Sequence, residues 1–494
     1  MTDSTSDTPS EFRPEARSPR GFADKRASQI ALERRLVETV TKVYEDFGFE
    51  ALQTPAFEYA DALGKFLPDS DRPNVGVFAL QDDDDQWMAL RYDLTAPLAR
   101  FAAQNWDGLP KPFRRYAFGP VYRNEKPGPG RLREFIQCDA DTVGTDRPEA
   151  DAEIIALAVA GFKAAGVPAL LRINNRKLLN GLLTSLGVTG PDQQMAVLRA
   201  IDKLDRLGVP GVELLLGKGR KDDSGDFTKG AGLADTAIRP VLDFVMAAEG
   251  GAARSLVLQR LGHVLANFPE GQAGLEDLTR IDTALTALGV SDSAAVFEPS
   301  IVRGLEYYTG AVFEAELLLE TRDEKGEMVR FGSVGGGGRY DDLVARFTGE
   351  RVPATGFSFG VSRLAAALRL VEGDKANAAR GPIVIINFSE SDMGAYFQLA
   401  AEIRAAGLAA EVYLGRSGMK AQMKYADRRL SPAAVMIGGD ELNNGTVTIK
   451  DLDLGRDLAL QISDNKAWRE GRPGQVTLPR AEAINHLKSI VKND

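Results

Sequence analysis

Cysteine and histidine are nearly absent from this chain of 494 residues, which contains one cysteine and two histidines. The single thiol, Cys138, excludes a disulfide framework within the chain. The two histidines, His263 and His486, are too few for a multi-histidine metal site, and neither falls in a recognisable motif. Thiol, histidine-base and multi-histidine metal mechanisms are therefore not expected.

Long apolar runs are also lacking. No stretch reaches the roughly 18 apolar residues that a membrane-spanning helix needs. The chain starts with a polar, acidic segment, whereas a signal peptide begins basic and continues apolar. We expect a cytoplasmic protein whose residues 1–18, rich in Ser, Thr, Asp and Pro, form a disordered tail.

Positive charge is in deficit, with a net charge of -10 and an isoelectric point near 5.1. A nucleic-acid partner is held through Lys and Arg, so such a partner would have to meet local basic patches. One patch is visible: Lys420, Lys424 and Arg428 recur every four residues on a predicted helix, with Arg416 and Arg429 beside them. The pattern alone leaves a solvated helix face and an RNA contact as equal alternatives.

The most informative segment spans residues 113–141, which read as two strands joined by a loop rich in Gly and Pro. A period of two gives the second strand an apolar face and a polar face, the latter with Arg133, Phe135, Gln137, Asp139 and Asp141. Arg123 and Arg131 bracket the loop, as a phosphate clamp requires. The alternative is an ordinary half-solvated hairpin.

This segment resembles the second signature motif of class II aminoacyl-tRNA synthetases, in which an Arg-x-Glu, here Arg123 to Glu125, and a Phe, here Phe135, grip ATP. Residues 90–100, 302–314 and 335–342 resemble elements particular to histidyl-tRNA synthetases, and residues 354–364 resemble the third class II motif. The helix expected over 30–44 and the strand within 48–55 resemble the first motif, which forms a dimer interface. Four linked motifs in family order make the resemblance specific.

The resemblance implies an α+β fold: a class II synthetase core with an antiparallel sheet flanked by helices, a helical insertion domain and a C-terminal α/β anticodon-binding domain. Helical periodicity over 173–295 and strands alternating with helices after Ile383 agree with this, the alternation predicting a parallel sheet. The expected boundaries are: tail 1–18, core 19–172, insertion 173–295, core 296–372, linker 373–382 and anticodon-binding domain 383–494.

The resemblance also implies an activity: a homodimer activates L-histidine with ATP and its accompanying Mg2+, then transfers histidine from the adenylate to tRNA(His). A carboxylate must attack an α-phosphate, so the site needs fixed cations more than acids and bases. The catalytic residues expected by resemblance are Arg303 and Arg123. The ATP-binding residues expected are Arg123, Glu125, Arg131, Phe135 and Arg363.

Histidine selection is expected, again by resemblance, from groups that contact both ends of the amino acid. Asp93, Thr95 and Gln137 match family positions that hold the α-amino group. Asp141 and Tyr308 match positions that hydrogen-bond the imidazole. The full expected set is Asp93, Thr95, Gln137, Asp141, Arg303, Tyr307 and Tyr308, over a pocket floor made by Gly335 to Gly338.

Two departures from the family pattern stand out. Ser362 occupies the place of an acidic residue before the third-motif Arg363, and Gly128 and Pro129 replace polar residues that meet the tRNA acceptor end in relatives. How the chain contacts that end is therefore left open.

The glycine-rich segment 217–225 lacks a P-loop ending and is either a flexible turn or an acceptor-stem contact.

Two other protein classes share single features with this sequence. A histidine-binding regulatory paralogue, such as the regulatory subunit of ATP phosphoribosyltransferase, lacks the C-terminal domain and the ATP-binding residues; Arg123, Arg303 and Arg363 favour the enzyme. A dinucleotide-binding oxidoreductase does not fit, because the glycine run 335–338 lacks the Gly-x-Gly-x-x-Gly pattern between a strand and a helix. The acidic run 82–85 is expected to be a solvated hairpin loop without a metal.

Overall fold

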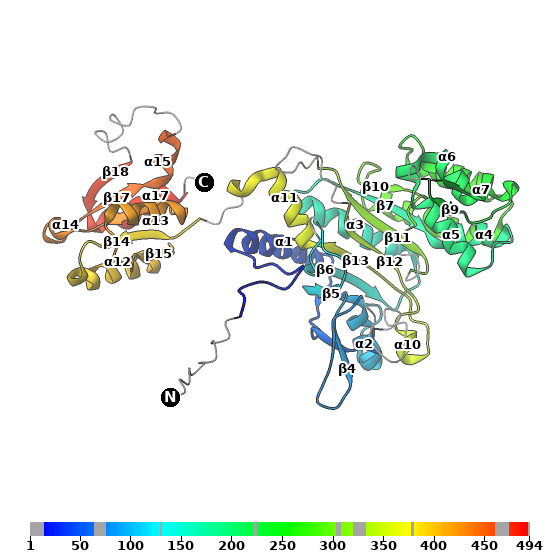
Figure 1. The fold of residues 1–494 in the computed structure, drawn as a ribbon, viewed down its shortest axis with the longest axis horizontal. Helices are drawn as coiled ribbons and strands as arrows, with labels where there is room; N and C mark the ends of the chain where they lie inside the picture. Colours follow the sequence, from blue (N-terminus) through cyan, green and yellow to red (C-terminus); the bar gives the residue numbers. More distant parts are fainter. Residues whose placement is uncertain are drawn as a thin grey trace, which may run out of the picture. The chain divides into compact units, whose positions relative to one another are not determined.

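The computed structural model describes residues 14–63, 76–128, 131–221, 225–302, 308–319, 332–376, 380–459 and 474–492. The chain divides into two compact units, Met1–Gly373 and Asp374–Asp494 (Figure 1). Among the described residues, no helix is both long enough and apolar enough to cross a membrane.

An eight-stranded sheet forms the centre of the first unit, in the order β1-β5-β6-β13-β12-β11-β7-β10. Neighbouring strands are antiparallel except for the parallel pairs β1 with β5 and β7 with β10 at the two edges. The antiparallel core predicted from the sequence is therefore confirmed. The strands are β1 (Glu50–Ala51), β5 (Phe113–Tyr122), β6 (Glu134–Val143), β7 (Ala169–Asn175), β10 (Ala295–Phe297), β11 (Ala311–Leu317), β12 (Ser333–Arg339) and β13 (Ala354–Gly360).

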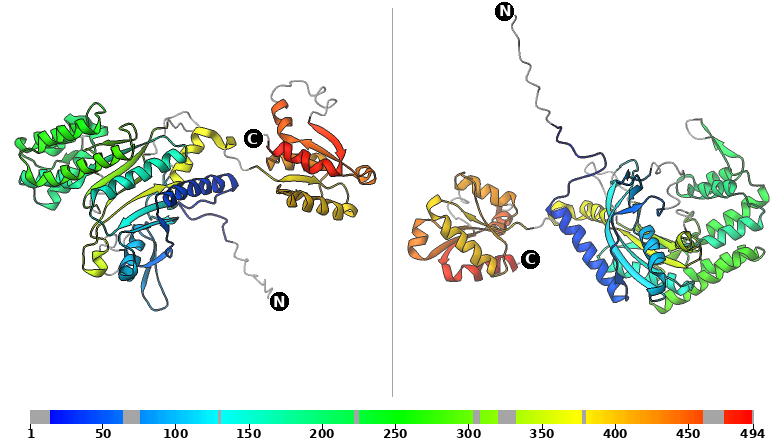
Figure 2. Two further views of the ribbon diagram at one scale, coloured as in Figure 1. Left: turned by 180° about the vertical axis from the view of Figure 1, so that it is seen from behind. Right: turned by 90° about the horizontal axis from the view of Figure 1, so that it is seen from below.

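Helices pack on the apolar face of this sheet, as the two views of Figure 2 make clear for α1 and α3. These helices are α1 (Ala27–Asp46), α3 (Pro148–Ala164), α9 (Gln272–Ala287) and α11 (Val361–Ala376). The predicted helix over 30–44 lies within α1, where Leu36, Val40 and Tyr44 are buried. The Tyr44 hydroxyl donates to the Cys138 carbonyl at 3.0 Å, which ties α1 to β6. Because this face is closed, the polar face must hold any site on the sheet.

A small sheet and two helices border the polar face. The sheet has the order β2-β4-β3 and consists of β2 (Phe57–Tyr59), β3 (Ala79–Gln81) and β4 (Trp87–Leu90); α2 (Thr95–Asn105) and α10 (Ala345–Thr348) follow later in the chain. The acidic run joins β3 to β4, and the Asp82 carboxylate accepts from the amides of Asp84 and Gln86 at 3.0 and 2.8 Å. The hairpin loop expected there is confirmed.

The segment expected to be a helical insertion is helical. Its helices include α4 (Arg176–Ser185), α5 (Pro191–Ile201), α6 (Leu204–Leu216), α7 (Asp235–Val245) and α8 (Arg254–Leu265). The glycine-rich segment 217–225 contributes to a two-stranded hairpin of β8 (Gly219–Lys221) and β9 (Phe227–Lys229), with residues 222–224 outside the described part.

The second unit has a five-stranded sheet in the order β15-β14-β16-β17-β18. Its strands are β14 (Ile383–Ile386), β15 (Ala410–Val412), β16 (Ala433–Met436), β17 (Thr446–Asp451) and β18 (Gln475–Pro479). Its helices include α12 (Met393–Ala405), α13 (Met419–Arg428), α14 (Gly439–Asn444), α15 (Leu452–Ala459) and α17 (Arg480–Lys492).

The parallel sheet predicted for this unit is only partly present. β14 is parallel to β15 and β16, as predicted, but β16, β17 and β18 pair antiparallel. The connection 437–445 between β16 and β17 is shorter than the dozen or so residues that a parallel crossover requires, so β17 must run back along β16. The sheet is therefore mixed.

Candidate active site

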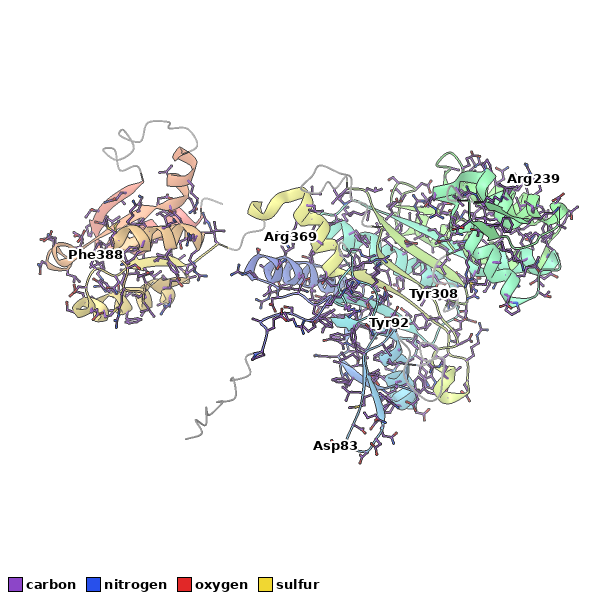
Figure 3. The ribbon with its side chains drawn as sticks, viewed as in Figure 1. Asp83, Tyr92, Arg239, Tyr308, Arg369 and Phe388 are labelled. Carbon is purple, nitrogen blue, oxygen red and sulfur yellow. The ribbon has the colours of Figure 1, made fainter. Side chains whose placement is uncertain are left out.

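A cavity of about 980 Å³ lies in the first unit, over the polar face of the main sheet. Side chains of β6, the hairpin loop, the segment before α2, and α5 contribute to its wall. Figure 3 marks two of its tyrosines, Tyr92 and Tyr308. Of the residues predicted from the sequence, those on the wall are Asp93, Thr95, Arg123, Glu125, Arg131, Phe135, Gln137, Tyr308 and Arg363.

Three guanidinium groups meet at one part of the wall. The Arg123 guanidinium lies 4.4 Å from the ring centre of Tyr92 and 5.2 Å from that of Phe135. Burial lowers the pKa of Arg363, and the charges of Arg131 and Arg123 lower it further. Cations whose charges repel one another favour a bound anion, because an anion relieves that repulsion.

Hydrogen-bond acceptors occupy another part of the wall. One oxygen of Asp93 accepts from the amides of Thr95 and Ala96 at 3.1 and 2.9 Å, which fixes the carboxylate at the start of α2. The Gln137 side-chain amide donates to the Ser358 hydroxyl at 2.8 Å. Its Oε1 has no hydrogen-bond partner among the described residues. This part of the site is suited to a group rich in donors.

The glycine run of β12 has two functions. Gly335 and Gly336 lie on the cavity wall, as expected of a pocket floor. Gly338 instead makes room for Tyr308, because a Cβ there would lie 2.8 Å from the Tyr308 ring. Burial, followed by the charges of Asp93 and other carboxylates, raises the pKa of Tyr308, so its hydroxyl stays protonated.

Asp141, predicted to reach the imidazole, is placed differently from the other predicted residues. It is 2% exposed and does not lie on the cavity wall. Its carboxylate is 2.8 Å from the buried Arg115 guanidinium and also accepts from the Tyr340 hydroxyl. The alternation along β6 correctly predicted which face of the strand carries Asp141. The Asp141 side chain, however, occupies space left by Gly356 on the neighbouring strand β13. A Cβ atom on Gly356 would lie 2.0 Å from Asp141 Oδ1.

Asp139 is the cavity residue that the sequence left without a role. It is 2% exposed and on the wall. Burial raises its pKa to about 8, with Asp141 raising it further and Arg115 opposing the shift. The sequence pattern could have indicated Asp139 as a site residue, because the strand alternation that places Gln137 and Asp141 on the polar face also places Asp139 there.

The insertion segment was not expected to border the site, yet it contributes to the wall through Met195, Leu198, Arg199, Asp202 and Lys203. A contact between segments so far apart in the chain leaves no periodic signal in the sequence. Arg303 and Tyr307, both predicted site residues, lie outside the described residues.

Comparison with known proteins bears directly on this site. A family model of histidyl-tRNA synthetases matches residues 21–364. A histidine–tRNA ligase from Caulobacter vibrioides is 67% identical over 494 residues, covering 99% of this chain and 100% of that protein. The chain belongs to the histidyl-tRNA synthetase family.

Further matches agree with this membership. A histidine–tRNA ligase from Rhodopseudomonas palustris is 54% identical over 497 residues, covering 97% of this chain and 96% of that protein. The crystal structure of histidyl-tRNA synthetase from Nostoc sp. PCC 7120 covers 97% of this chain and 100% of its own, with a TM-score of 0.73 and 28% identity. An anticodon-binding-domain model matches residues 382–489. The class II core and the C-terminal anticodon-binding domain implied by the resemblance are thus confirmed.

The fold also occurs in a Bacillus halodurans structure described as an ATP phosphoribosyltransferase regulatory subunit/histidyl-tRNA synthetase. That structure is 22% identical, with a TM-score of 0.65, and covers 86% of this chain and 99% of its own. At this identity the likeness concerns the fold alone.

Ser362, the departure in the third synthetase motif, has a partner from another motif. Its hydroxyl donates to Glu33 of α1 at 2.6 Å and accepts from the Ile136 amide at 3.0 Å. Lys25 lies 2.8 Å from the same Glu33 carboxylate. A carboxylate is therefore present beside Ser362, supplied by α1 rather than by the third motif itself.

Proposed function

We propose that this protein is a histidine–tRNA ligase that forms histidyl-adenylate from L-histidine and ATP and transfers the histidine to tRNA(His), with release of AMP and diphosphate. The proposal rests on one cavity, whose wall combines several guanidinium groups with a set of hydrogen-bond acceptors. The cavity lies in the part of the chain that matches the histidyl-tRNA synthetase family. ATP and the amino acid have these complementary requirements, since one is a polyanion and the other carries an ammonium group.

The arginine cluster is our proposed ATP site. Arg123, Arg131 and Arg363 would bind the phosphates, and Phe135 would stack on the adenine. Glu125 accepts a hydrogen bond from the Tyr92 hydroxyl at 3.1 Å, which holds it at the same end of the cavity. Fixed guanidinium groups lower the repulsion between the histidine carboxylate and the α-phosphate. They would therefore promote the formation of histidyl-adenylate by electrostatic stabilisation.

The acceptor side is our proposed histidine site. Asp93, Thr95 and Gln137 would hold the α-amino group. Tyr308 would contact the imidazole, and Asp141 would act at this end of the pocket together with its partners Arg115 and Tyr340. Tyr307 and Arg303 complete the proposed set by family position, Arg303 as a second catalytic cation next to Arg123.

Mg2+ is proposed to arrive with ATP. Among the described residues, no group of three or more His, Cys, Asp and Glu could hold a metal ion. When bound, the ion offsets phosphate charge. The arginines of this chain orient the α-phosphate, and the acceptor groups orient the amino acid.

Recognition of tRNA is proposed to involve the second unit. Lys420, Lys424 and Arg428, which we call the α13 stripe, are all exposed. Arg429 is a weaker candidate than the sequence indicated, because it lies 3.2 Å from Glu411. The α13 stripe offers three charges for RNA phosphates on a chain that is acidic as a whole.

We also propose a cytoplasmic homodimer, with α1 and the strand after it at the interface, as in the first class II motif. Large apolar side chains on one face of the small sheet are exposed, namely Phe57, Tyr59 and Leu80. A cluster of this kind supports self-association. Light scattering should give a mass near twice the 53.3 kDa of one chain, and a monomer mass in active samples would refute the dimer.

The decisive experiment for the activity is histidine-dependent ATP–pyrophosphate exchange. Exchange should require histidine and no other amino acid, and added tRNA(His) should then become charged. Exchange with a different amino acid, or none with histidine, would overturn the proposal.

A further inference from the structure

The carboxyl groups near the proposed histidine site differ in how fully their oxygens are hydrogen-bonded. Asp93 caps α2 and Asp141 is paired with Arg115. Asp139 has a hydrogen bond with the Ser358 hydroxyl, but its Oδ1 is buried without a hydrogen-bond partner among the described residues. A buried acceptor without a partner destabilises the folded chain, because it has given up its hydrogen bonds to water. A residue kept in this state on a cavity wall is suited to a ligand that supplies the missing donor.

The position of Asp139 in the sheet identifies its companions. Gln137 and Asp139 lie two residues apart on β6, so their side chains share one face, and both pair with β13, where Ser358 lies opposite Asp139. Ser358 accepts from Gln137 Nε2 at 2.8 Å, and Gln137 Oε1 is a second buried acceptor without a partner among the described residues. The two orphan acceptors belong to one small area of the wall.

The chemistry of the missing partner follows from this set. Gln137 Oε1 and Asp139 Oδ1 accept and do not donate when the carboxyl group of Asp139 is ionised, and the carboxylate of Asp93 on the same wall offers further acceptor oxygens. An ammonium group has three donors and no acceptor, whereas one imidazole nitrogen offers a single donor. A set consisting only of acceptors therefore fits the α-ammonium group better than the ring.

We propose that Asp139 binds the α-ammonium group of histidine together with Gln137, as a further substrate-binding residue of this chain. The inference rests on the proposed function and adds to it a carboxylate at the amine end. Asp139 disfavours ligands that lack a charged amine, because such a ligand would leave its oxygen unpaired.

The charge state of Asp139 supplies an independent readout. The charged and titratable groups near it are Asp141 on the same strand, Arg115 from β5, Arg91 and Asp93 from the segment before α2, and Tyr308. Tyr44 of α1 and Cys138 on the same strand also interact with its charge. Its pKa of about 8 means that the empty site holds it protonated at neutral pH, and ionisation is needed before it can pair with a cation. Histidine affinity should therefore rise as pH increases towards 8, and Asp139→Asn should remove this part of the rise.

The test compares full-length wild type with Asp139→Asn by calorimetric titration of histidine, histidinol and imidazolepropionate. Histidinol keeps the ammonium group and imidazolepropionate lacks it. Loss of a charge-assisted hydrogen bond should weaken histidine and histidinol binding about 10- to 100-fold and leave imidazolepropionate unchanged. The matched control is Asp83→Asn, which removes one carboxylate at the tip of an exposed loop (Figure 3) and should change none of the three affinities.

Other outcomes separate the possible failures. An equal loss for imidazolepropionate would mean that Asp139 contacts the ring, and unchanged histidine affinity would mean that it contacts neither end; both overturn the inference. Absence of histidine-dependent exchange in the wild type would count against the proposed function instead. Asn matches the size and neutral state of the protonated carboxyl, so an unchanged melting temperature at pH 6 shows that the variant is folded.

Discussion

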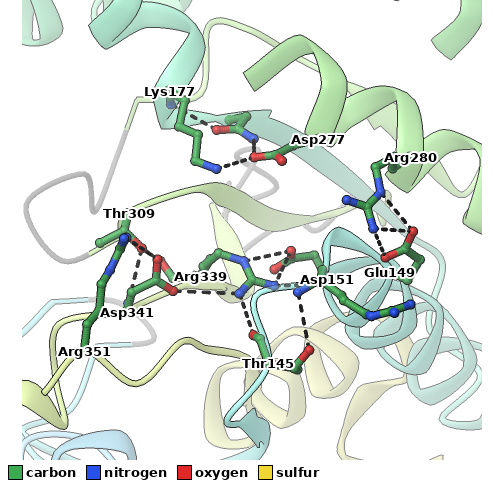
Figure 4. A network of polar contacts seen from close by, with 12 residues as sticks. Thr145, Glu149, Asp151, Lys177, Asp277, Arg280, Thr309, Arg339, Asp341 and Arg351 are labelled. Atoms are coloured by element: carbon green, nitrogen blue, oxygen red, sulfur yellow. Dashed lines mark hydrogen bonds and ion pairs between the residues drawn. The ribbon is translucent and has the colours of Figure 1, made fainter. Parts of the chain in front are cut away.

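The Arg339–Asp151 pair gives the sharpest stability prediction. Figure 4 shows the Arg339 guanidinium at the centre of a polar network. Its Nε and Nη2 donate to Asp151 Oδ2 at 3.0 and 2.7 Å, and Nη1 and Nη2 donate to the carbonyls of Thr145 and Arg147 at 2.8 and 2.9 Å. Arg339 is 4% exposed and Asp151 2%, so water cannot replace a lost partner.

Asp151→Leu should therefore cost about 3–5 kcal/mol, because it removes the carboxylate that accepts two hydrogen bonds from the buried guanidinium and leaves Asp341, at 3.8 Å, as the remaining counter-charge. With an unfolding entropy of about 2.1 cal/mol/K per residue, a unit of 373 residues loses about 1.3 °C per kcal/mol. The melting temperature of that unit should fall by about 4–6 °C, measured by scanning calorimetry. Histidine-dependent exchange well below the transition should persist, since none of these side chains lies on the cavity wall.

The double variant Asp151→Leu with Arg339→Met is the control. It removes both charges, so it should be less destabilised than the sum of the single variants, although two carbonyls lose donors. A fall of less than 1 °C for Asp151→Leu, or strict additivity in the double variant, would show that the pair is not energetically coupled.

Three further predictions concern other parts of the chain. Ser362→Glu places a second carboxylate where a hydroxyl now lies 2.6 Å from Glu33, so calorimetry should show a lower melting temperature that Glu33→Gln in the same chain restores; an unchanged midpoint contradicts this. Cys138 is 0% exposed and burial raises its thiol pKa, so a disulfide reagent should label it only after denaturation, and rapid labelling of native protein would refute the assignment. Replacing the α13 stripe by three glutamines should weaken tRNA binding and reduce its salt slope by about one unit per lost phosphate contact, with exchange preserved; unchanged affinity in a binding titration would make the stripe a solvated face.

Local patterns predicted those parts of the structure that local forces determine. Alternation separated the two faces of β6, and helical spacing located α1, because burial on one side imposes a period on the sequence. Motif order correctly indicated the family and the antiparallel core. Of the predicted ATP and histidine residues within the described chain, all but Asp141 lie on one cavity wall.

The remaining features depend on contacts between distant segments. Nothing near Asp141 in the sequence reveals that Arg115 and Tyr340 surround it, or that a glycine on β13 makes room for it. The contribution of α5 to the wall and the partnership of Glu33 with Ser362 are equally non-local. The antiparallel β17 was missed because its direction depends on the length of one connection.

The glycine run of β12 also has a consequence for the order of folding. β12 is central in its sheet, between β11 and β13, yet four consecutive positions carry no side chain that could pack early. Each glycine loses more backbone entropy on ordering than another residue, by roughly 0.5–1 kcal/mol. β12 is therefore expected to join the sheet late, after both neighbouring strands are in place to supply hydrogen bonds. The floor of the substrate pocket would then be completed only when the whole core has assembled, which couples the capacity to bind histidine to the final step of folding.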